Sequence, residues 1–148
     1  MRIDFYILAD ASLGTREQFA CRIVEKAYRM GHRVYLFTDS EAHAARIDGL
    51  LWTFRDGSFV PHARLAERIE PAPPVLIGND SGDGAPDADI IINLTTTAPA
   101  CFQRYERVAE IVDASDDGRR SGRERFRYYR EQGIEPQSHP IDANRSAD

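Results

Sequence analysis

The stretch Arg2-Ile-Asp-Phe-Tyr-Ile-Leu-Ala9 alternates polar and apolar residues and then runs apolar, which is typical of a strand buried on at least one face. Thr15-Arg-Glu-Gln18 is a capping box that predicts the start of a helix running to about Met30. Gly31 ends that helix, and residues 33–37, Arg-Val-Tyr-Leu-Phe, predict a second strand. Strand, helix and strand in succession predict a βαβ unit with a right-handed crossover.

The chain then continues to alternate helices and strands. Thr38-Asp-Ser-Glu41 is a second capping box, and the apolar stripe after it predicts a helix that ends near Phe54. Pro61 lacks a backbone donor, so residues 59–62 are expected to form a loop or an edge strand. Three compact segments predict buried strands, namely residues 75–77, 90–94 and 107–112. We therefore expect a single-domain α/β fold, with a mostly parallel, Rossmann-like sheet flanked by helices.

The segment from Arg119 to Gly133 contains six arginines and three aromatic residues. Ser115 or Asp116 can cap its start and Gly133 suits its end, so the segment predicts a helix. At helical spacing one face carries four arginines and the neighbouring stripe is apolar: Arg119, Arg123, Arg127 and Arg130, with Gly122, Phe126 and Tyr129. Such a surface suits an anionic peptide with a hydrophobic end. The alternative is a solvated helix whose aromatic residues pack in the core.

Residues from Glu135 onward are polar, interrupted by proline and without a period. This pattern is typical of a segment that cannot bury enough apolar surface to become ordered. We therefore expect one α/β domain over residues 1–134 and a mobile C-terminal tail over residues 135–148.

The length, composition and charge of the chain exclude several classes of protein. A chain of 148 residues can bury a sufficient core without disulfides or metals, and Cys21 and Cys101 are expected to be reduced core side chains. No apolar run approaches the roughly 20 residues of a membrane span, and the first ten residues do not resemble a secretory signal. We expect a cytoplasmic protein that does not bind membranes. A net charge of −5 argues against binding bare nucleic acid through the overall field.

The sequence lacks the motifs of common catalytic and cofactor sites. Residues 9–15, after the first strand, have no spaced glycines that would let the backbone approach a pyrophosphate. The four histidines are scattered, and the Asp/Gly-rich segment 78–84 lacks the closing glutamate of a calcium loop. No serine or cysteine sits in a nucleophile elbow. We expect a protein with no catalytic residues, no cofactor and no metal.

Several features in a fixed order resemble the chi subunit family of bacterial DNA polymerase III. They are the order of elements, the pair Leu51-Trp52 at the end of the second helix, the loop Ser58-Phe-Val-Pro-His62, and Arg123-Glu-Arg-Phe-Arg-Tyr-Tyr-Arg130 in the late helix. The resemblance runs from the first strand to Gly133, whereas the acidic Gly/Pro loop and the tail match poorly. It implies a non-catalytic accessory subunit of the clamp-loader assembly, with a Rossmann-like fold that binds no nucleotide, working at the bacterial nucleoid.

The resemblance also implies two binding surfaces. One would hold the psi subunit of the clamp loader, and Trp52 and Phe59 would belong to it; ordinary core packing is the other reading of these two rings. The second surface would capture the acidic C-terminal tail of the single-stranded-DNA-binding protein, so that DNA is contacted only indirectly. Its arginines would meet tail carboxylates, and its apolar residues would form the floor under a terminal phenylalanine: Arg119, Arg123 and Arg127, with Val112 and Phe126. Phe126 stands where a tyrosine is common in that family.

Two other functions stay open on the residues alone. A small α/β nucleotide-binding enzyme would have its site at the strand ends near Asp10, Thr38 and Asp39. A direct binder of single-stranded nucleic acid would use the Arg- and Tyr-rich helix for phosphate contacts and stacking. The missing glycines count against the first function, and the net acidity of the chain counts against the second.

Overall fold

A single seven-stranded sheet organises the chain in a computed structural model, which describes residues 1–55, 57 and 59–142. All strand pairs are parallel, and the strand order is β3-β4-β2-β5-β6-β1-β7. The strands are β1 Arg2–Leu8, β2 Val34–Phe37, β3 His62–Arg64, β4 Val75–Gly78, β5 Ile90–Asn93, β6 Arg107–Val112 and β7 Gln137–Ile141. The predicted α/β, Rossmann-like class is confirmed, and the strands predicted from the sequence correspond to β1, β2, β4, β5 and β6.

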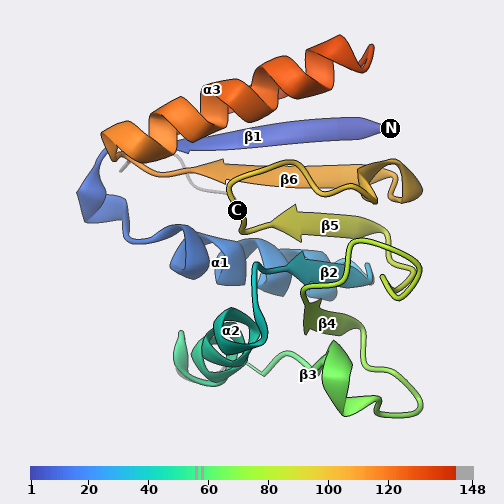
Figure 1. Cartoon of the computed structure of the whole chain (residues 1–148). Helices are drawn as coiled ribbons and strands as arrows, with labels where there is room; N and C mark the ends of the chain where they lie inside the picture. The colour runs from blue at the N-terminus through green and yellow to red at the C-terminus, as the bar shows by residue number, and fades with distance from the viewer. Residues whose placement is uncertain (56, 58, 143–148) are drawn as a thin grey trace.

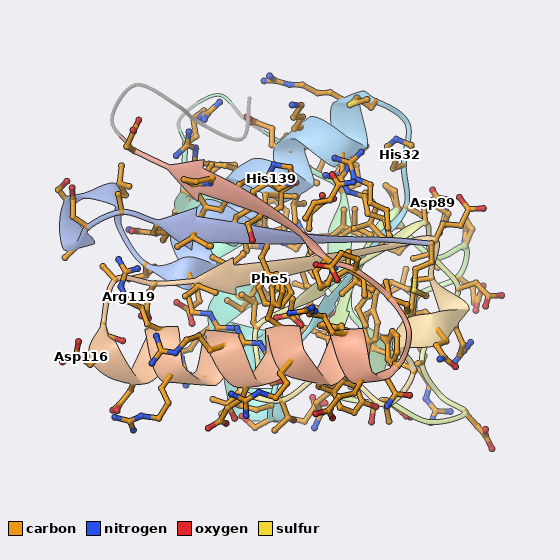
Figure 2. All side chains as sticks on the ribbon, turned by 90° about the horizontal axis from the view of Figure 1, so that it is seen from above. Phe5, His32, Asp89, Asp116, Arg119 and His139 are labelled. Atoms are coloured by element: carbon orange, nitrogen blue, oxygen red, sulfur yellow. The ribbon has the colours of Figure 1, made fainter. Side chains whose placement is uncertain are left out.

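Helices cover both faces of the sheet. The α-helices are α1 Arg16–Arg29, α2 Glu41–Thr53 and α3 Asp116–Glu131, and three 3-10 turns lie in the connections, at Ala11–Leu13, Leu65–Glu67 and Phe102–Arg104. The apolar sides of α1 and α2 share one core with one face of the sheet, and α3 packs in a second core on the opposite face. Figure 1 shows α3 and α2 at opposite ends of the sheet, and Figure 2 shows α3 and α1 on its two faces.

The limits of α1 and α3 follow the caps expected from the sequence, whereas α2 is capped by Ser40 and not by the expected capping box that begins at Thr38. The Thr15 hydroxyl accepts the backbone N–H of Gln18, and the Gln18 side chain accepts the backbone N–H of Thr15, so the capping box of α1 is complete. Ser115 accepts the N–H of Gly118 at the start of α3. Gly133, with φ of 86°, follows the end of α3 in the left-handed region.

The outer strands differ in how well the sequence indicated them. Residues 59–62 were expected to be a loop or an edge, and β3 begins at His62 and lies at one edge of the sheet. The segment beginning at Glu135 was expected to be a mobile tail, but Gln137–Ile141 forms β7 at the other edge. There the His139 ring lies 2.7 Å from the Asp4 carboxylate and stacks on Tyr6, so contacts with distant residues replace the missing apolar pattern. Residues 143–148 lie outside the described residues.

Two further expectations concern the cysteines and the membrane. Cys21 and Cys101 are both free and buried, as expected of core side chains. None of the helices in the described part of the chain combines the length and the apolar content that crossing a bilayer requires.

Candidate functional site

Helix α3 lies close to β6 because a glycine faces the strand. A Cβ atom at Gly122 would lie 2.6 Å from Cγ2 of Val112, closer than real Cβ contacts come. Glycine therefore permits the short distance between the helix and the strand, and it leaves the Val112 side chain as a floor beside the helix. The packing of the helix thus places Val112, one of the residues expected at the tail-binding site, directly beside α3.

A buried polar network fixes the other side of α3. Arg125 Nε donates to Glu110 Oε1 at 2.8 Å, and the Tyr129 hydroxyl donates to Glu110 Oε2 at 2.6 Å. Asn93 Nδ2 donates to the same carboxylate at 3.0 Å. Burial, followed by the negative charge of Glu110, raises the pKa of Tyr129 far above its ordinary value, so the hydroxyl stays protonated and donates. The network holds the rotation of α3 about its axis and so directs its other arginines outward.

The sequence analysis assigned no role to Arg125. Its side chain is only 3% exposed, in contrast to the arginines on the outer face of the same helix. Its spacing from Ser121 and Tyr129, one turn away on either side, was the available signal, because residues four apart share one helix face. The buried Glu110 in the middle of β6 was a second signal, since a buried carboxylate requires a partner.

A hollow of about 250 Å³ lies between α3 and the sheet edge formed by β1 and β7. Its lining is mainly apolar: Phe5, Ile7, Val112, Arg119, Gly122, Arg123, Phe126 and Ser138. The Phe126 ring lies 5.2 Å from the Phe5 ring and is partly exposed, so it is accessible at the floor of the hollow. Arg119 donates to the carbonyl of Ala9 at 3.2 Å, which fixes its guanidinium near the rim. Figure 2 labels Phe5 in the sheet and Arg119 near the start of α3.

A second hollow of about 490 Å³ adjoins the first along α3. It is lined by Arg123, Phe126, Arg127, Arg130 and Glu131, so the two hollows share Arg123 and Phe126. We call the two together the α3 groove. One end of the α3 groove is apolar, and the other end carries three guanidinium groups and one carboxylate.

The arginines of the α3 groove differ in how far their charges are already compensated. Within the described residues, the side chains of Arg123 and Arg127 make no ion pair and no hydrogen bond, and both residues are exposed. Arg130 lies 3.2 Å from Glu135, a pair in which both side chains are exposed. Arg123 and Arg127 therefore present uncompensated positive charge to a ligand in the groove.

The structure gathers all five residues expected at the tail-binding site in the α3 groove: Val112, Arg119, Arg123, Phe126 and Arg127. The sequence analysis did not identify Phe5, Ile7 and Ser138, which complete the apolar end. Phe5 and Ile7 alternate with Asp4 and Tyr6 along β1, so their shared face was readable from the sequence. Which face α3 covers was not readable.

Trp52 and Phe59 lie side by side on the surface at the opposite edge of the sheet. Trp52 is 55% exposed and Phe59 62% exposed, and their ring centroids are 5.6 Å apart. Trp52 lies in the last turn of α2, and Phe59 precedes β3, which α2 contacts. We call these two rings the aromatic pair. Core packing, the other reading of both residues, is excluded by their exposure.

The strand order separates the aromatic pair from the α3 groove. β3 is one edge strand and β7 is the other, and the α3 groove is lined by residues of β1 and β7. Figure 1 shows the same separation, with α3 at the top next to β1 and α2 near the bottom at the level of β4 and β3. The two surfaces therefore lie near opposite edges of the sheet.

The carboxyl ends of the central strands, where open α/β sheets commonly hold ligands, are occupied by Arg16. Its guanidinium donates to the carbonyls of Ile111 at 2.9 Å and Thr95 at 3.0 Å. Burial lowers the pKa of Arg16 below its ordinary value. Residues near the strand ends make local contacts: Asp10 accepts the Ser12 N–H, and Thr38 donates to the carbonyl of Gly78. Asp39 lies 3.2 Å from His43.

Acidic, histidine and cysteine side chains do not gather into a metal site in the part of the chain that the structure describes. No group of three or more such residues is close enough together to hold an ion. The arrangement of the described surfaces is that of a Rossmann-like α/β protein with a cationic groove on one helix and an exposed aromatic pair at the far edge.

Comparison with known proteins places the chain within this class. A family model described as the DNA polymerase III chi subunit, HolC, matches residues 1–137. The chain belongs to the family of DNA polymerase III chi subunits, which are accessory subunits of the bacterial replicative polymerase.

Relatives from three bacteria support the assignment. The DNA polymerase III subunit chi of Pseudomonas aeruginosa is 43% identical over 95% of this chain and 96% of its own length. The corresponding subunit of Escherichia coli is 31% identical over 88% of this chain and 91% of its length. That of Haemophilus influenzae is 30% identical over 87% of this chain and 90% of its length.

Solved structures share the fold at low sequence identity. The C-terminal domain of the DEAD-box protein Dbp5 is similar with a TM-score of 0.60 at 14% identity, covering 94% of this chain and 90% of the domain. A Saccharomyces cerevisiae Dbp5 C-terminal domain gives a TM-score of 0.59 at 15% identity, covering 96% of this chain and 92% of that one. At such identity the likeness concerns the sheet and its helices alone.

Proposed function

We propose that this chain is a non-catalytic adaptor at the replisome, which joins the clamp loader to the single-stranded-DNA-binding protein. The α3 groove binds the acidic C-terminal tail of the single-stranded-DNA-binding protein. The aromatic pair binds the psi subunit of the clamp loader. DNA itself is contacted only through these partners.

The observation that carries this proposal is the pairing of uncompensated arginines with an apolar hollow in one groove. Arg123 and Arg127 have no ion-pair partner within the described residues, and Phe126 lies at the junction with the apolar end. Guanidinium groups bind carboxylates through paired N–H donors, and a ring floor takes up an apolar side chain. An acidic peptide with an apolar terminal residue matches both ends of the groove.

The same geometry sets the strength of binding. An exposed ion pair contributes only about 0.2–1 kcal/mol, and a peptide tail loses conformational entropy when it is ordered. Several ion pairs and a buried ring are therefore needed together for even micromolar affinity, and we expect weak binding. Because exposed charges are screened by salt, binding weakens as the ionic strength rises.

The aromatic pair has the character of a protein-binding surface. Trp and Tyr dominate the energetics of many interfaces, and large exposed rings seldom lie together on a surface without a partner. Its position at the edge opposite the α3 groove lets the psi subunit and the tail bind simultaneously.

Two observations favour the adaptor over the rival functions. The guanidinium of Arg16 lies against the carbonyls at the strand ends, where a nucleotide would bind in an open α/β sheet. The chain is acidic overall, whereas binding of a single-stranded nucleic acid without an apolar anchor depends on concentrated positive charge.

One titration series tests the proposal. A labelled acidic tail peptide ending in phenylalanine, a single-stranded oligonucleotide and a panel of nucleotides are each added to the chain at the same low salt concentration. We expect saturable binding of the peptide alone, measured by fluorescence anisotropy. Tighter binding of the oligonucleotide or of a nucleotide than of the peptide would reject the adaptor function.

A further inference from the structure

The ring of His62 lies directly beneath the aromatic pair. Its side chain is 1% exposed, and its ring centroid is 4.8 Å from that of Trp52. Trp52 contacts Phe59 in turn. His62 thus forms the buried support of two rings that are themselves exposed.

Both ring nitrogens of His62 face oxygen atoms. Nδ1 lies 2.6 Å from the carbonyl oxygen of Val60, and Nε2 lies 3.2 Å from Oδ1 of Asp48. The second contact has the distance of an ion pair without the geometry of a hydrogen bond. Nε2 is accordingly the one buried side-chain nitrogen or oxygen in the described part of the chain that lacks a hydrogen-bond partner.

The protonation state of the ring decides whether both contacts are favourable. A neutral imidazole carries one N–H, so in either tautomer it turns one lone pair toward an oxygen. The imidazolium carries an N–H on both nitrogens and a positive charge that faces the Asp48 carboxylate. Only the protonated ring donates to the Val60 carbonyl and at the same time places a positive charge beside the Asp48 carboxylate.

Among the described contacts of the His62 ring, the Asp48 carboxylate is the one charged group. Among the described contacts, α2 contributes the Asp48 carboxylate and the face of Trp52, and the loop before β3 contributes the Val60 carbonyl. β4 pairs with β3 and places apolar Val75 opposite His62. The Trp52 ring also favours a cation close to its face.

We propose that His62 is a positioning residue of the partner surface, whose protonated form links β3 to Asp48 of α2 and thereby fixes the aromatic pair. Loss of the proton places a lone pair against an oxygen and loosens the pair. The aromatic pair is therefore best ordered when His62 is protonated, and its partner binds more tightly in that state. The coupling inside the chain is independent of the proposed function, whereas its effect on partner binding rests on that function.

The test uses the intrinsic fluorescence of Trp52, which is the only tryptophan of the chain. Emission from the full chain is recorded from about pH 8 to about pH 5, the range in which histidine commonly changes its charge. We expect a sigmoidal change in emission that is lost in His62→Gln and is smaller in Asp48→Asn, which removes the charged partner of the ring. His32→Gln is the matched control, because His32 lies beside Asp89 and has no described ring contact with Trp52 (Figure 2). It should behave as the unmodified chain does.

A flat emission profile in the unmodified chain, or an unchanged profile in His62→Gln, would overturn the proposal. If His62→Gln does not fold, the nitrogen chemical shifts of the His62 ring in the unmodified chain decide instead. They must change together with the Trp52 indole signal, and independent changes count against the coupling. Binding of the psi subunit at the two ends of the pH range forms a separate arm. A pH-dependent emission without any psi binding would reject the proposed partner and leave the coupling intact.

Discussion

Gly122 of α3 faces Val112 of β6 so closely that a methyl group on the glycine would lie 2.6 Å from the valine Cγ2. The contact sets the distance between the helix and the sheet, and both residues line the apolar end of the α3 groove. The shape of the proposed site thus depends on a residue that contributes no side chain.

Substitution Gly122→Ala should therefore destabilise the fold. The added methyl group displaces Val112 or lifts the helix, and overpacking of this kind costs about 1–3 kcal/mol. Urea unfolding followed by circular dichroism measures the loss. Gly49→Ala is the matched control, since Gly49 lies within α2 and a Cβ there meets no atom within 4 Å. That variant should gain up to about 1 kcal/mol from helix propensity. Equal effects in both variants would contradict the steric role of Gly122.

Substitution Arg123→Glu should weaken binding of the acidic tail peptide by roughly tenfold or more, which corresponds to at least about 1.4 kcal/mol. The reason is that Arg123 is shared by the two hollows of the α3 groove and has no competing ion pair within the described chain. Arg120→Glu controls for the change in net charge, because Arg120 lies on the same helix but outside both hollows and pairs with Asp117. Fluorescence anisotropy with a labelled peptide gives both affinities. If the Arg123→Glu variant bound the peptide as tightly as the unmodified chain, the α3 groove would be excluded as the binding site of the tail.

Substitution Phe59→Ala should abolish co-purification with the psi subunit and leave tail binding unchanged. The exposed Phe59 ring belongs to the aromatic pair at the sheet edge opposite the α3 groove. Arg123→Glu should show the reverse pattern. Loss of both partners in either variant would mean that the two surfaces are not independent.

Substitution Arg125→Met should lower the free energy of unfolding by about 3–5 kcal/mol, because it leaves the buried Glu110 carboxylate without its cation. Arg125 is 3% exposed and Glu110 is fully buried. Arg127→Met, two residues along the same helix, removes an exposed arginine and should change stability by less than about 0.5 kcal/mol. Denaturant unfolding compares the two. Similar losses would show that the buried ion pair does not hold α3 on the sheet.

The Asp4 carboxylate predicts how stability changes in acid. Burial alone would raise the pKa of Asp4, but hydrogen bonds from His139 and Arg2 and the charge of Arg107 outweigh it and lower the pKa below its ordinary value of 3.8. A lowered pKa in the folded state stabilises the protein above pH 3.8, and this contribution is lost as the pH falls through the folded-state value. Asp4→Asn should therefore be less stable at neutral pH and lose less stability in acid. Asp87→Asn, at a fully exposed carboxylate, should keep the acid sensitivity of the unmodified chain in thermal unfolding.

Most of the fold could be predicted from local patterns in the sequence. The caps at Thr15 and Ser115, the apolar β-branched strands and the spacing of Arg123 and Arg127 depend on near neighbours in the chain, and the structure has each of them where the pattern indicated. The class of fold follows from such signals because parallel α/β units repeat them.

Contacts between distant residues explain what the sequence did not indicate. Gln137–Ile141 has no apolar alternation, and its strand depends on Asp4 and Tyr6, which lie more than a hundred residues away. In the sequence, residue type does not distinguish Arg125 from the exposed arginines of the same helix. Its contact with Glu110 of β6 in the folded chain does. The apolar end of the α3 groove likewise required knowing which side of β1 the helix would cover.

The pairing of β7 with β1 also has a consequence for biosynthesis. Contacts between residues so far apart in the chain form late, since closing a long loop costs entropy before any interaction compensates it. Ser138 of β7 lines the α3 groove. A chain that is still being synthesised on the ribosome therefore lacks this side of the groove until β7 has been translated. The α3 groove of an unfinished chain would thus lack part of its apolar end, and the proposed tail binding should require a chain translated beyond β7.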